Sequence, residues 1–353
     1  MKDSEQVSLN AFLAAVKAGL PTSWDWRQPV LVAVSGGADS MALLHGLLAL
    51  ARQGGAACSR QLNVVHVEYD LRPTAPRDRM FVVEQSASLG LPCHWRRLPL
   101  TEPGARLAGE GVEAAARRLR YAVLAELAGV LGARHVAVGH TFDDQAETIL
   151  HRVLRGTGLT GLAGMPWARE LAEGVCLVRP LLGLRREHLR SFLATQEHPW
   201  VEDESNLDTG FSRNFLRHAV LAAVEQGPYP AATEALVRLG EQATAHAAFR
   251  TVRVDQLIAA ALRDCPDGAV LLERAGLGQA GNDPHLVADV LLAIWRQQGW
   301  PRQELSRDHL QRLTAMLGLP SRGEANAPTA VDLPGGVRAR QHPAGLHLRR
   351  VET

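Results

Sequence analysis

The stretch Pro29-Val30-Leu31-Val32-Ala33-Val34-Ser35-Gly36-Gly37-Ala38-Asp39-Ser40 decides how the first part of this 353-residue chain folds. It opens with a short, continuous apolar run, which is typical of a strand buried on both faces of a parallel sheet. Two glycines then allow backbone conformations with positive φ, and an apolar-striped segment follows from Asp39 to about Ala51. We therefore expect a strand, a glycine-rich turn and a helix in direct succession.

The same alternation continues along the chain. Further strands are expected at 62–67, 93–98, 135–139 and 175–180, and helices at 78–89, 112–131, 143–155 and 185–196. Strands that alternate with helices predict an α/β fold, a doubly wound parallel sheet of the Rossmann-like kind, in which ligands bind beyond the carboxyl ends of the strands. A smaller, mainly helical domain is expected next, with helices near 232–263, 284–298 and 307–317 and a final β-meander at 329–333, 337–341 and 345–349.

Composition narrows the class of protein. The net charge is only +1, so an RNA partner must be held by local basic clusters rather than by a global field. The four cysteines form no C-x-x-C pair, which argues against zinc ribbons, redox motifs and cysteine-held iron–sulfur clusters. The N-terminus has no signal-peptide pattern, and no apolar run approaches the ~20 residues that span a membrane. We expect a cytoplasmic protein without a membrane partner.

The loop Ser35-Gly36-Gly37-Ala38-Asp39-Ser40 is predicted to bind phosphate. The N–H groups of the first helical turn and the helix dipole favour an anion there. The loop lacks the Gly-Lys-Ser/Thr ending of a Walker A motif, and it carries Asp39 instead. A carboxylate beside phosphates needs an intervening cation, so Asp39 is a candidate Mg²⁺ ligand. The alternative is a plain Gly-Gly turn in which Asp39 is the N-cap of the helix.

Motifs further along the chain resemble one enzyme family. Ser-Gly-Gly-x-Asp-Ser is similar to the loop of the N-type ATP pyrophosphatases, which activate an oxygen by adenylation and release pyrophosphate. Within that group, five segments resemble the tRNA(Ile)-lysidine synthetases: 139–148, 154–158, 161–165, 202–206 and 212–217. The resemblance is strong over 29–218, and Leu333-Pro334-Gly335-Gly336 supports it more weakly in the second domain.

The resemblance implies a reaction and a domain plan. The family attaches free L-lysine to C2 of the wobble cytidine in the CAU anticodon of isoleucine tRNA, which changes codon reading from AUG to AUA. ATP, with Mg²⁺, adenylates the cytidine O2, and the lysine ε-amine then displaces AMP. We expect an N-terminal helix and connector at 1–28, the catalytic domain at 29–218 and a helical plus small β tRNA-binding domain at 219–353. The chain then resembles the shorter form of the family.

Two carboxylates are candidates for binding the substrate lysine. Asp144 and Glu147 are three residues apart on a predicted helix, so they share a face, and a carboxylate pair attracts a cationic amine. These positions match the lysine-binding pair of the family. The alternative is a capping box with Asp144 as N-cap and Glu147 as its partner.

The resemblance assigns roles to further residues. His140, at the end of the fourth strand, is expected to contact phosphate or move a proton, although a structural histidine is the alternative. Arg117 matches an arginine near the reaction centre that neutralises developing charge. The backbone of His66 and Val67 is expected to contact adenine. Residues expected near the RNA, unless they form a charged helix face, are Arg213, Asn214 and Arg217.

Some residues depart from the family pattern, and other functions compete. Glu68, Tyr69 and Asp70 differ from the family's usual residues after the second strand, and Thr141 stands where a second histidine is common. We carry no family role over to Tyr69 or Thr141. A tRNA thiolase shares the phosphate loop but generally needs catalytic cysteines. A non-catalytic nucleotide- or RNA-binding module is the other alternative, and a homodimer is the assembly that we consider.

Overall fold

The computed structural model describes residues 8–70, 73–102, 104–202, 212–266, 268–301, 305–318 and 328–351, without the side chains of residues 212, 213, 279 and 281. The chain divides into two compact units, Met1–Gln242 and Ala243–Thr353, and the division falls within helix α11 (Ala232–Ala261). The boundaries expected at 28/29 and 218/219 stay predictions. In the described part of the chain, no helix is long and apolar enough to cross a membrane.

A six-stranded sheet forms the centre of the first unit, in the order β3-β2-β1-β4-β6-β5. Its strands are β1 (Val30–Ala33), β2 (Leu62–Tyr69), β3 (Cys93–Leu98), β4 (His135–Val138), β5 (Ala168–Ala172) and β6 (Val175–Val178). All neighbours are parallel except β5, which pairs antiparallel with β6 at the edge. The parallel sheet expected from the sequence is confirmed, and β5 is an addition to it.

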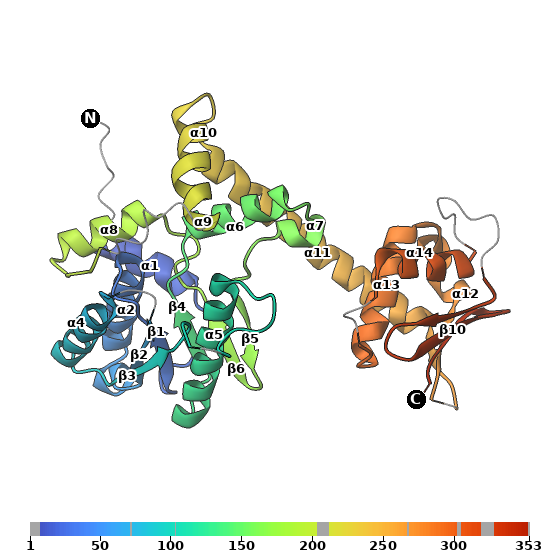
Figure 1. The fold of residues 1–353 in the computed structure, drawn as a ribbon, viewed down its shortest axis with the longest axis horizontal. Helices are drawn as coiled ribbons and strands as arrows, with labels where there is room; N and C mark the ends of the chain where they lie inside the picture. Colours follow the sequence, from blue (N-terminus) through green and yellow to red (C-terminus); the bar gives the residue numbers. More distant parts are fainter. Residues whose placement is uncertain are drawn as a thin grey trace. The chain divides into compact units, whose positions relative to one another are not determined.

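Helices cover both faces of this sheet, as Figure 1 shows. Val30 and Val32 of β1 face one side, in a core that includes side chains of four helices: α1 (Leu9–Ala18), α2 (Ala38–Gln53), α4 (Ala75–Ser88) and α8 (Arg186–Thr195). Leu31 faces the other side, where it joins side chains of α5 (Val112–Leu131). Successive residues of a strand point to opposite faces. The continuous apolar run is therefore required because both faces of β1 are buried.

The chain reverses its direction across the sheet at β1. From β1 it moves outward to β2 and β3, and it then returns to add β4 on the opposite side of β1. The loops after β1 and β4 consequently face each other at a topological switch point, the usual ligand site of such sheets. They are in close contact, because a Cβ atom added at Gly139 would lie 3.2 Å from the carbonyl carbon of Asp39.

We expect Gly139→Ala to separate these two loops and to weaken ATP binding about tenfold, because the new methyl group meets backbone rather than a flexible side chain. Isothermal titration with ATP measures the change. Gly129→Ala is the matched control, since Gly129 lies inside α5 with nothing within 4 Å of an added Cβ. Equal ATP affinities of the two variants would show that the close approach is not needed for binding.

A histidine pair in the first unit predicts a pH dependence of stability. The rings of His45 and His198 stack with centroids 3.6 Å apart, and the Nε2 atom of buried His45 has no hydrogen-bond partner. Burial, with smaller contributions from His198 and Arg52, lowers the pKa of His45 to about 4. Since the unfolded chain takes up this proton near pH 6.5 and the folded chain does not, stability falls as the pH drops from 6.5 towards 4.

Thermal unfolding followed by circular dichroism across this pH range tests that expectation. We expect His45→Gln to flatten the decline in melting temperature, because glutamine does not titrate. His188→Gln is the control, since His188 is a partly exposed histidine of α8. An unchanged slope in His45→Gln would assign the pH dependence to other groups.

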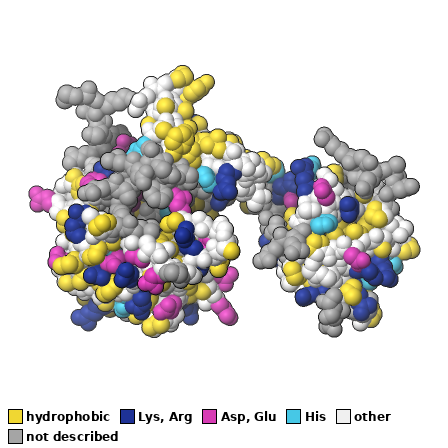
Figure 2. All heavy atoms as spheres, in the orientation of Figure 1, with side chains coloured by type: hydrophobic (Ala, Val, Ile, Leu, Met, Phe, Trp, Pro, Cys, Tyr) yellow, Lys and Arg dark blue, Asp and Glu magenta, His cyan; other side chains and the backbone are white. Residues whose placement is uncertain are grey.

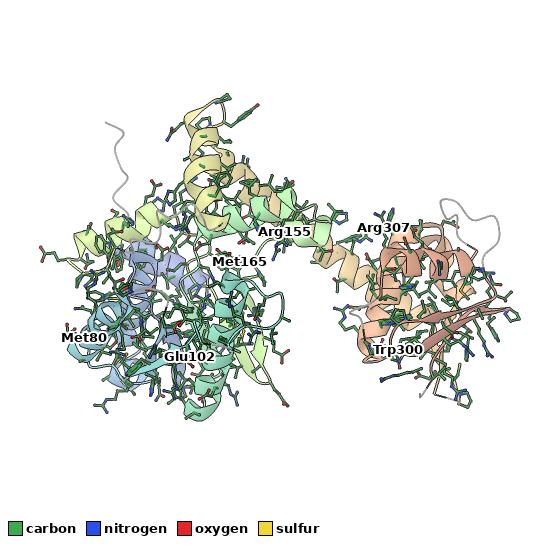
Figure 3. The ribbon with its side chains drawn as sticks, viewed as in Figure 1. Met80, Glu102, Arg155, Met165, Trp300 and Arg307 are labelled. Atoms are coloured by element: carbon green, nitrogen blue, oxygen red, sulfur yellow. The ribbon has the colours of Figure 1, made fainter. Side chains whose placement is uncertain are left out.

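The glycine-rich stretch after α6 (Phe142–Leu154) is tied back to that helix. Gln145 donates from Nε2 to the carbonyl of Met165 at 3.0 Å and accepts from the Met165 amide at 2.7 Å. Arg152 donates to the carbonyls of Gly161 and Gly164, both at 2.8 Å. Gly164 has φ +67° and approaches the Gln145 amide closely. These contacts hold the segment between α6 and Met165 against α6. The segment includes the short helix α7 (Leu159–Leu162), and Figure 3 labels Met165.

Three short helical pieces lead from the sheet to α11: α9 (Ser212–Phe215), the π-helix η2 (Leu216–Leu221) and α10 (Ala222–Gln226). A further short helix, α3 (Ala56–Ser59), precedes β2. Single-turn π-helical segments are rare and often occur at functional sites. This one brings Arg217 to the carboxyl edge of the sheet.

The second unit packs helices against an antiparallel sheet in the order β7-β8-β11-β10-β9. Its other elements are α12 (Arg274–Leu277), η3 (Gly278–Asn282), α13 (Pro284–Gln297), α14 (Arg307–Met316), β7 (Leu262–Asp264), β8 (Val270–Glu273), β9 (Ala330–Leu333), β10 (Val337–His342) and β11 (Gly345–Arg350). The expected helices and β-meander are confirmed. The β7–β8 hairpin was not expected from the sequence.

Charge is mixed on the surface. On the face drawn in Figure 2, basic and acidic side chains are interspersed rather than gathered into one basic surface. This agrees with the net charge of +1. Local clusters therefore decide where anions bind.

Candidate active site

The glycine-rich loop joins β1 to α2, as the sequence predicts. Gly36 has φ +96°, and Gly37 is the N-cap of α2 but makes no side-chain cap. The Ser40 hydroxyl donates to the carbonyl of Gly37 at 2.9 Å and accepts from the Ser35 amide at 3.1 Å. The loop is thus braced by its own serines, and no side chain of the N-cap uses the first-turn amides of α2. These amides suit a phosphate.

Asp39 is the second residue of α2, so the alternative that makes Asp39 the N-cap is wrong. Its Oδ2 atom lies 3.4 Å from Nε of Arg186, the first residue of α8. Burial raises the pKa of Asp39 to about 6, although Arg186 opposes the rise; Asp144 adds to it. Since Asp39 is in the first turn of α2, its carboxylate lies beside the phosphate loop. This is the position expected of a residue that binds a metal ion together with phosphates.

Asp144 and Glu147 lie on the first turns of α6 and are nearly inaccessible, with 9% and 1% of their surfaces exposed. Asp144 does belong to a capping box, but not the one considered from the sequence. Thr141 is the N-cap: its hydroxyl accepts from the Asp144 amide at 3.2 Å, and the Asp144 carboxylate accepts from the Thr141 amide at 2.8 Å. Glu147 takes no part in the cap, so its buried carboxylate needs another explanation.

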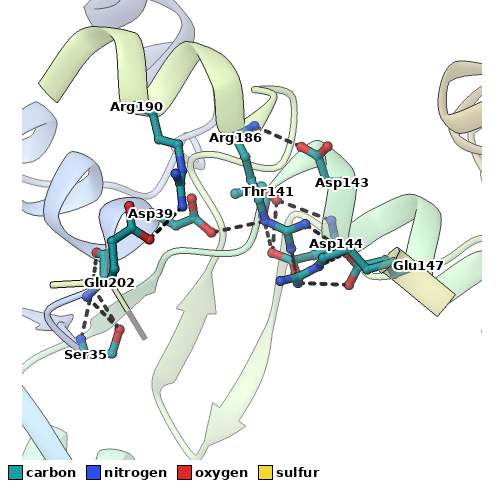
Figure 4. A network of polar contacts seen from close by, with 12 residues as sticks. Ser35, Asp39, Thr141, Asp143, Asp144, Glu147, Arg186, Arg190 and Glu202 are labelled. Atoms are coloured by element: carbon teal, nitrogen blue, oxygen red, sulfur yellow. Dashed lines mark hydrogen bonds and ion pairs between the residues drawn. The ribbon is translucent and has the colours of Figure 1, made fainter. Parts of the chain in front are cut away.

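Two arginines bind these carboxylates (Figure 4). Arg186 donates from Nη1 to Glu147 Oε1 at 2.8 Å and from Nη2 to Asp144. Arg217 donates from Nε to the same Glu147 oxygen at 2.7 Å and from Nη2 to Oε2 at 3.3 Å. Arg217 therefore does not lie on a solvated helix face. The guanidinium group of Arg186 connects Asp39 with the Asp144–Glu147 pair.

Electrostatics agree with this arrangement. Burial alone would raise the pKa of Asp144, but Arg186, His140 and Arg217 outweigh burial and lower it. Asp143, the residue before Asp144, also holds Arg186 in place. Its Oδ2 atom accepts from the Arg186 amide at 2.9 Å at the start of α8. The Asp144 carboxylate is thus held ionised in a site where cations are favoured.

Arg186 was not predicted as a site residue from the sequence. Its position at the first turn of a helix that follows β6 was the only signal, and many surface helices begin with a basic residue. Only the tertiary structure shows that this turn faces the loops after β1 and β4.

His140 lies next to the same edge and is mostly buried. Its Nδ1 atom accepts from Nε of Arg179 at 3.2 Å, so the proton of the neutral ring is on Nε2. His66 has the opposite arrangement, because its Nδ1 donates to the carbonyl of Val34 at 2.9 Å. Burial lowers the pKa of His66, which favours the neutral ring.

Comparison with known proteins identifies the family. The PP-loop domain family matches residues 6–224. The chain is 37% identical over 334 residues to the tRNA(Ile)-lysidine synthase of Salinispora arenicola, covering 93% of this chain and 92% of that protein. The chain belongs to the tRNA(Ile)-lysidine synthase family of PP-loop proteins. Its identity to the tRNA(Ile)-lysidine synthase of Thermus thermophilus is 41% over 216 residues, or 61% of this chain.

Relatives differ in length. The chain covers only 39% of the Thermus protein and 52% of the relative from Solibacter usitatus. Among solved structures, a U34-tRNA thiolase from Methanococcus maripaludis with its [4Fe-4S] cluster matches with a TM-score of 0.52. That match covers 66% of this chain and 78% of the thiolase at 15% identity, so it shows a shared fold alone.

Three of the residues that depart from the family pattern make contacts of their own. Thr141 closes the capping box at the start of α6, a task that its hydroxyl performs. Glu68 is buried and pairs with Arg79 at 3.1 Å, while Asp70 accepts from the Thr101 hydroxyl at 2.6 Å. Leu71 and Arg72, which match the family pattern, lie outside the described residues.

Other predicted site residues lie on α5, β2 and α9. Arg117 extends from α5, with its guanidinium carbon 5.0 Å from the centre of the Tyr121 ring. Val67 follows His66 in β2 and is half-buried. Asn214 lies in α9, three residues before Arg217. The side chain of Arg213 lies outside the described residues.

Proposed function

We propose that the protein ligates L-lysine to C2 of the wobble cytidine in the CAU anticodon of isoleucine tRNA, converting ATP to AMP and pyrophosphate. The product reads AUA in place of AUG. One observation supports this most: a buried carboxylate pair faces the phosphate loop across the switch point, connected through Arg186. The family relatives are named for the same product.

Two transfers complete the reaction. In the first, the cytidine O2 attacks the α-phosphorus of ATP and pyrophosphate leaves. The loop from Ser35 to Ser40 would hold the departing phosphates, because its first-turn amides point to an anion. In the second, the neutral ε-amine of lysine attacks C2, AMP leaves with the O2 atom, and the new C–N bond loses a proton to solvent or base. Cleavage between α- and β-phosphates needs no Walker lysine.

Mg²⁺ fits the residues at the loop. Asp39 offers one carboxylate beside the phosphate site, and Mg²⁺ commonly uses one or two carboxylates together with substrate phosphates. Among the described residues, no group of three His, Cys, Asp or Glu side chains is placed to hold a metal ion without such help. The ion would neutralise phosphate charge, while Asp39 would position it.

Asp144 and Glu147 are the proposed site for lysine. Their carboxylates bind two guanidinium groups, and this supports a site for a cationic amine. A lysine ammonium group would share them with Arg186 and Arg217. A buried charge is costly unless it is paired. The lysine ammonium group would therefore take over hydrogen bonds that the carboxylates now accept from the two arginines.

Further roles complete the proposal. Arg117 would neutralise charge on the adenylate, and His140 would contact phosphate or move a proton from Nε2. The backbone at His66 and Val67 would contact adenine. The tRNA would approach along Arg213, Asn214 and Arg217. Because the proposed enzyme uses tRNA and ATP, we expect it in the cytoplasm. The homodimer stays a prediction.

The test uses ATP, radiolabelled lysine and an isoleucine tRNA transcript with a CAU anticodon. Label in the RNA together with pyrophosphate release supports the proposal. A transcript with uridine at the wobble position is the control and should stay unlabelled. Pyrophosphate release without label would indicate another acceptor, as in a thiolase. Neither product would indicate a non-catalytic nucleotide- or RNA-binding module.

A further inference from the structure

The guanidinium group of Arg186 contacts three carboxylates at once. Its Nε atom lies 3.4 Å from Asp39 Oδ2, its Nη1 atom donates to Glu147 Oε1 at 2.8 Å, and its Nη2 atom donates to Asp144. Figure 4 shows this side chain between Asp39 and the start of α6. Asp39 is the proposed metal ligand, whereas Asp144 and Glu147 are the proposed ligands of lysine. One side chain of α8 thus contacts both halves of the candidate site.

The oxygens that Arg186 contacts are the ones that a lysine ammonium group would need. Asp144 uses Oδ2 in the capping box, where it accepts from the Thr141 amide at 2.8 Å, and its Oδ1 atom accepts from Arg186. Glu147 accepts from Arg186 at Oε1. An ammonium group that bridges the two carboxylates would use these same two oxygens, because the cap already uses Oδ2 of Asp144. Arg186 and the substrate lysine therefore compete for one place.

Arg217 keeps the buried Glu147 carboxylate paired if Arg186 leaves. It donates from Nε to Oε1 at 2.7 Å and from Nη2 to Oε2 at 3.3 Å, so it holds both oxygens of Glu147. A buried charge is costly unless it is paired. Because Arg217 stays and lysine replaces the other cation, neither carboxylate loses its positive partner in the exchange. Of the two arginines, Arg186 is therefore the one that can be replaced.

The backbone of Arg186 is fixed beside the phosphate loop, while its side chain is long and flexible. Its amide donates to Asp143 Oδ2 at 2.9 Å in the first turn of α8. The side chain is 19% exposed, and its Nε atom already reaches the carboxylate of Asp39. Arginine keeps its charge in proteins. A rotation of the side chain alone can thus move a full positive charge from the carboxylate pair towards the phosphate loop.

We propose that Arg186 occupies the lysine site until ATP binds, and that bound ATP draws it out of that site. Phosphate oxygens attract a guanidinium group, because its planar fork matches them in pairs. Asp39 Oδ2, once it binds Mg²⁺ together with the nucleotide, no longer accepts from Arg186. Both effects favour a position of Arg186 at the phosphates and free Asp144 and Glu147 for lysine. The inference rests on the proposed ATP and lysine sites.

Competition of this kind makes ATP and lysine bind cooperatively. A ligand shifts an equilibrium between two states only as far as it prefers one of them, and lysine binds the state in which Arg186 has turned away. ATP therefore raises the affinity for lysine, and by linkage lysine raises the affinity for ATP by the same factor. The protein then takes up lysine mainly when the nucleotide that activates the cytidine is in place.

Equilibrium dialysis with radiolabelled L-lysine, with and without Mg²⁺ and a non-hydrolysable ATP analogue, tests the inference. In the unaltered protein we expect the analogue to raise the lysine affinity about tenfold. Arg186→Gln removes the competing cation, so without the analogue it should bind lysine about tenfold more tightly than the unaltered protein. The analogue should then change its lysine affinity by less than about twofold. Arg186→Lys keeps a cation and should retain the weak binding.

Arg190→Gln is the matched control, since Arg190 lies on the next turn of α8 and pairs with Glu202 at 3.0 Å. It removes the same charge from the same helix, and it should change neither the lysine affinity nor the effect of the analogue on that affinity. Circular dichroism confirms that each variant is folded.

Three results would overturn the inference and leave the proposed function intact. Weaker lysine binding by Arg186→Gln would show that Arg186 holds the carboxylates in place for lysine. Equal lysine affinities of the unaltered protein with and without the analogue would show that ATP does not displace Arg186. Loss of the analogue's effect in Arg190→Gln as well would assign the coupling to the charge of α8 as a whole. If the unaltered protein bound lysine under neither condition, the lysine site itself would be wrong, and the inference with it.

Discussion

Replacement of Asp39 by alanine is expected to abolish pyrophosphate release, with a loss of at least about a hundredfold in kcat. Asp39 is the only acidic residue in the first turn of α2, directly beside the phosphate-binding amides. Without its carboxylate, Mg²⁺ loses a ligand and phosphate charge is less well neutralised as the α–β bond breaks. Effects of this size, about 3 kcal/mol, are usual when one group that stabilises a transition state is removed.

The measurement is release of labelled pyrophosphate at saturating ATP and tRNA. Asp39→Asn is the informative second variant, because it keeps the shape and the contact with Arg186 but removes the charge. Both variants should fail to release pyrophosphate. A titration of Mg²⁺ binding in the presence of a non-hydrolysable ATP analogue provides a readout that does not depend on turnover. Near-normal pyrophosphate release in either variant would remove Asp39 from the metal site.

Replacement of Glu147 by glutamine is expected to raise the KM for lysine by about ten- to a hundredfold and the KM for ATP much less. The carboxylate is 1% exposed and accepts hydrogen bonds from two arginines, so its charge is central to the cation site. Hydrogen bonds to charged groups contribute about 1.5–3 kcal/mol, which corresponds to this range. Lysine then binds to one carboxylate rather than two.

A control separates lysine binding from scaffolding. Glu234→Gln makes the same chemical change at a carboxylate that pairs with Arg185, the neighbour of Arg186. It should leave both KM values close to those of the unaltered enzyme. If Glu147→Gln raises the two KM values equally, its carboxylate orders Arg186 and Arg217 rather than binding lysine. Equilibrium dialysis with labelled lysine distinguishes these outcomes without catalysis.

Local patterns predicted much of the fold. The apolar run at 29–34 predicted β1 because a strand with two buried faces cannot alternate. The edge strand β5 was missed, since its half-exposed residues have no strong pattern. The hairpin of β7 and β8 was missed for a related reason: β7 follows α11 directly, with no turn residue to mark where the helix ends.

In the candidate site, too, the sequence predicted some features and missed others. Motif spacing placed Asp39, Asp144 and Glu147 near one edge of the sheet, and the structure brings all three within contact of Arg186. The alternative capping box was predicted three residues too far along the chain, with Asp144 as N-cap. The sequence does not show which residue has the extended backbone of an N-cap. Thr141 has that backbone, with φ −110° and ψ 174°.

The sequence by itself determined the phosphate loop. Ser35 to Ser40 follow an apolar strand and open a helix, so their backbone geometry depends on neighbours along the chain. Only the tertiary structure decided what faces that loop. Arg186 and Arg217 are far from Asp39 and Glu147 in the sequence, and β4 must return beside β1 before their charges meet. Contacts of that kind depend on the order of strands in the sheet, which no local pattern records.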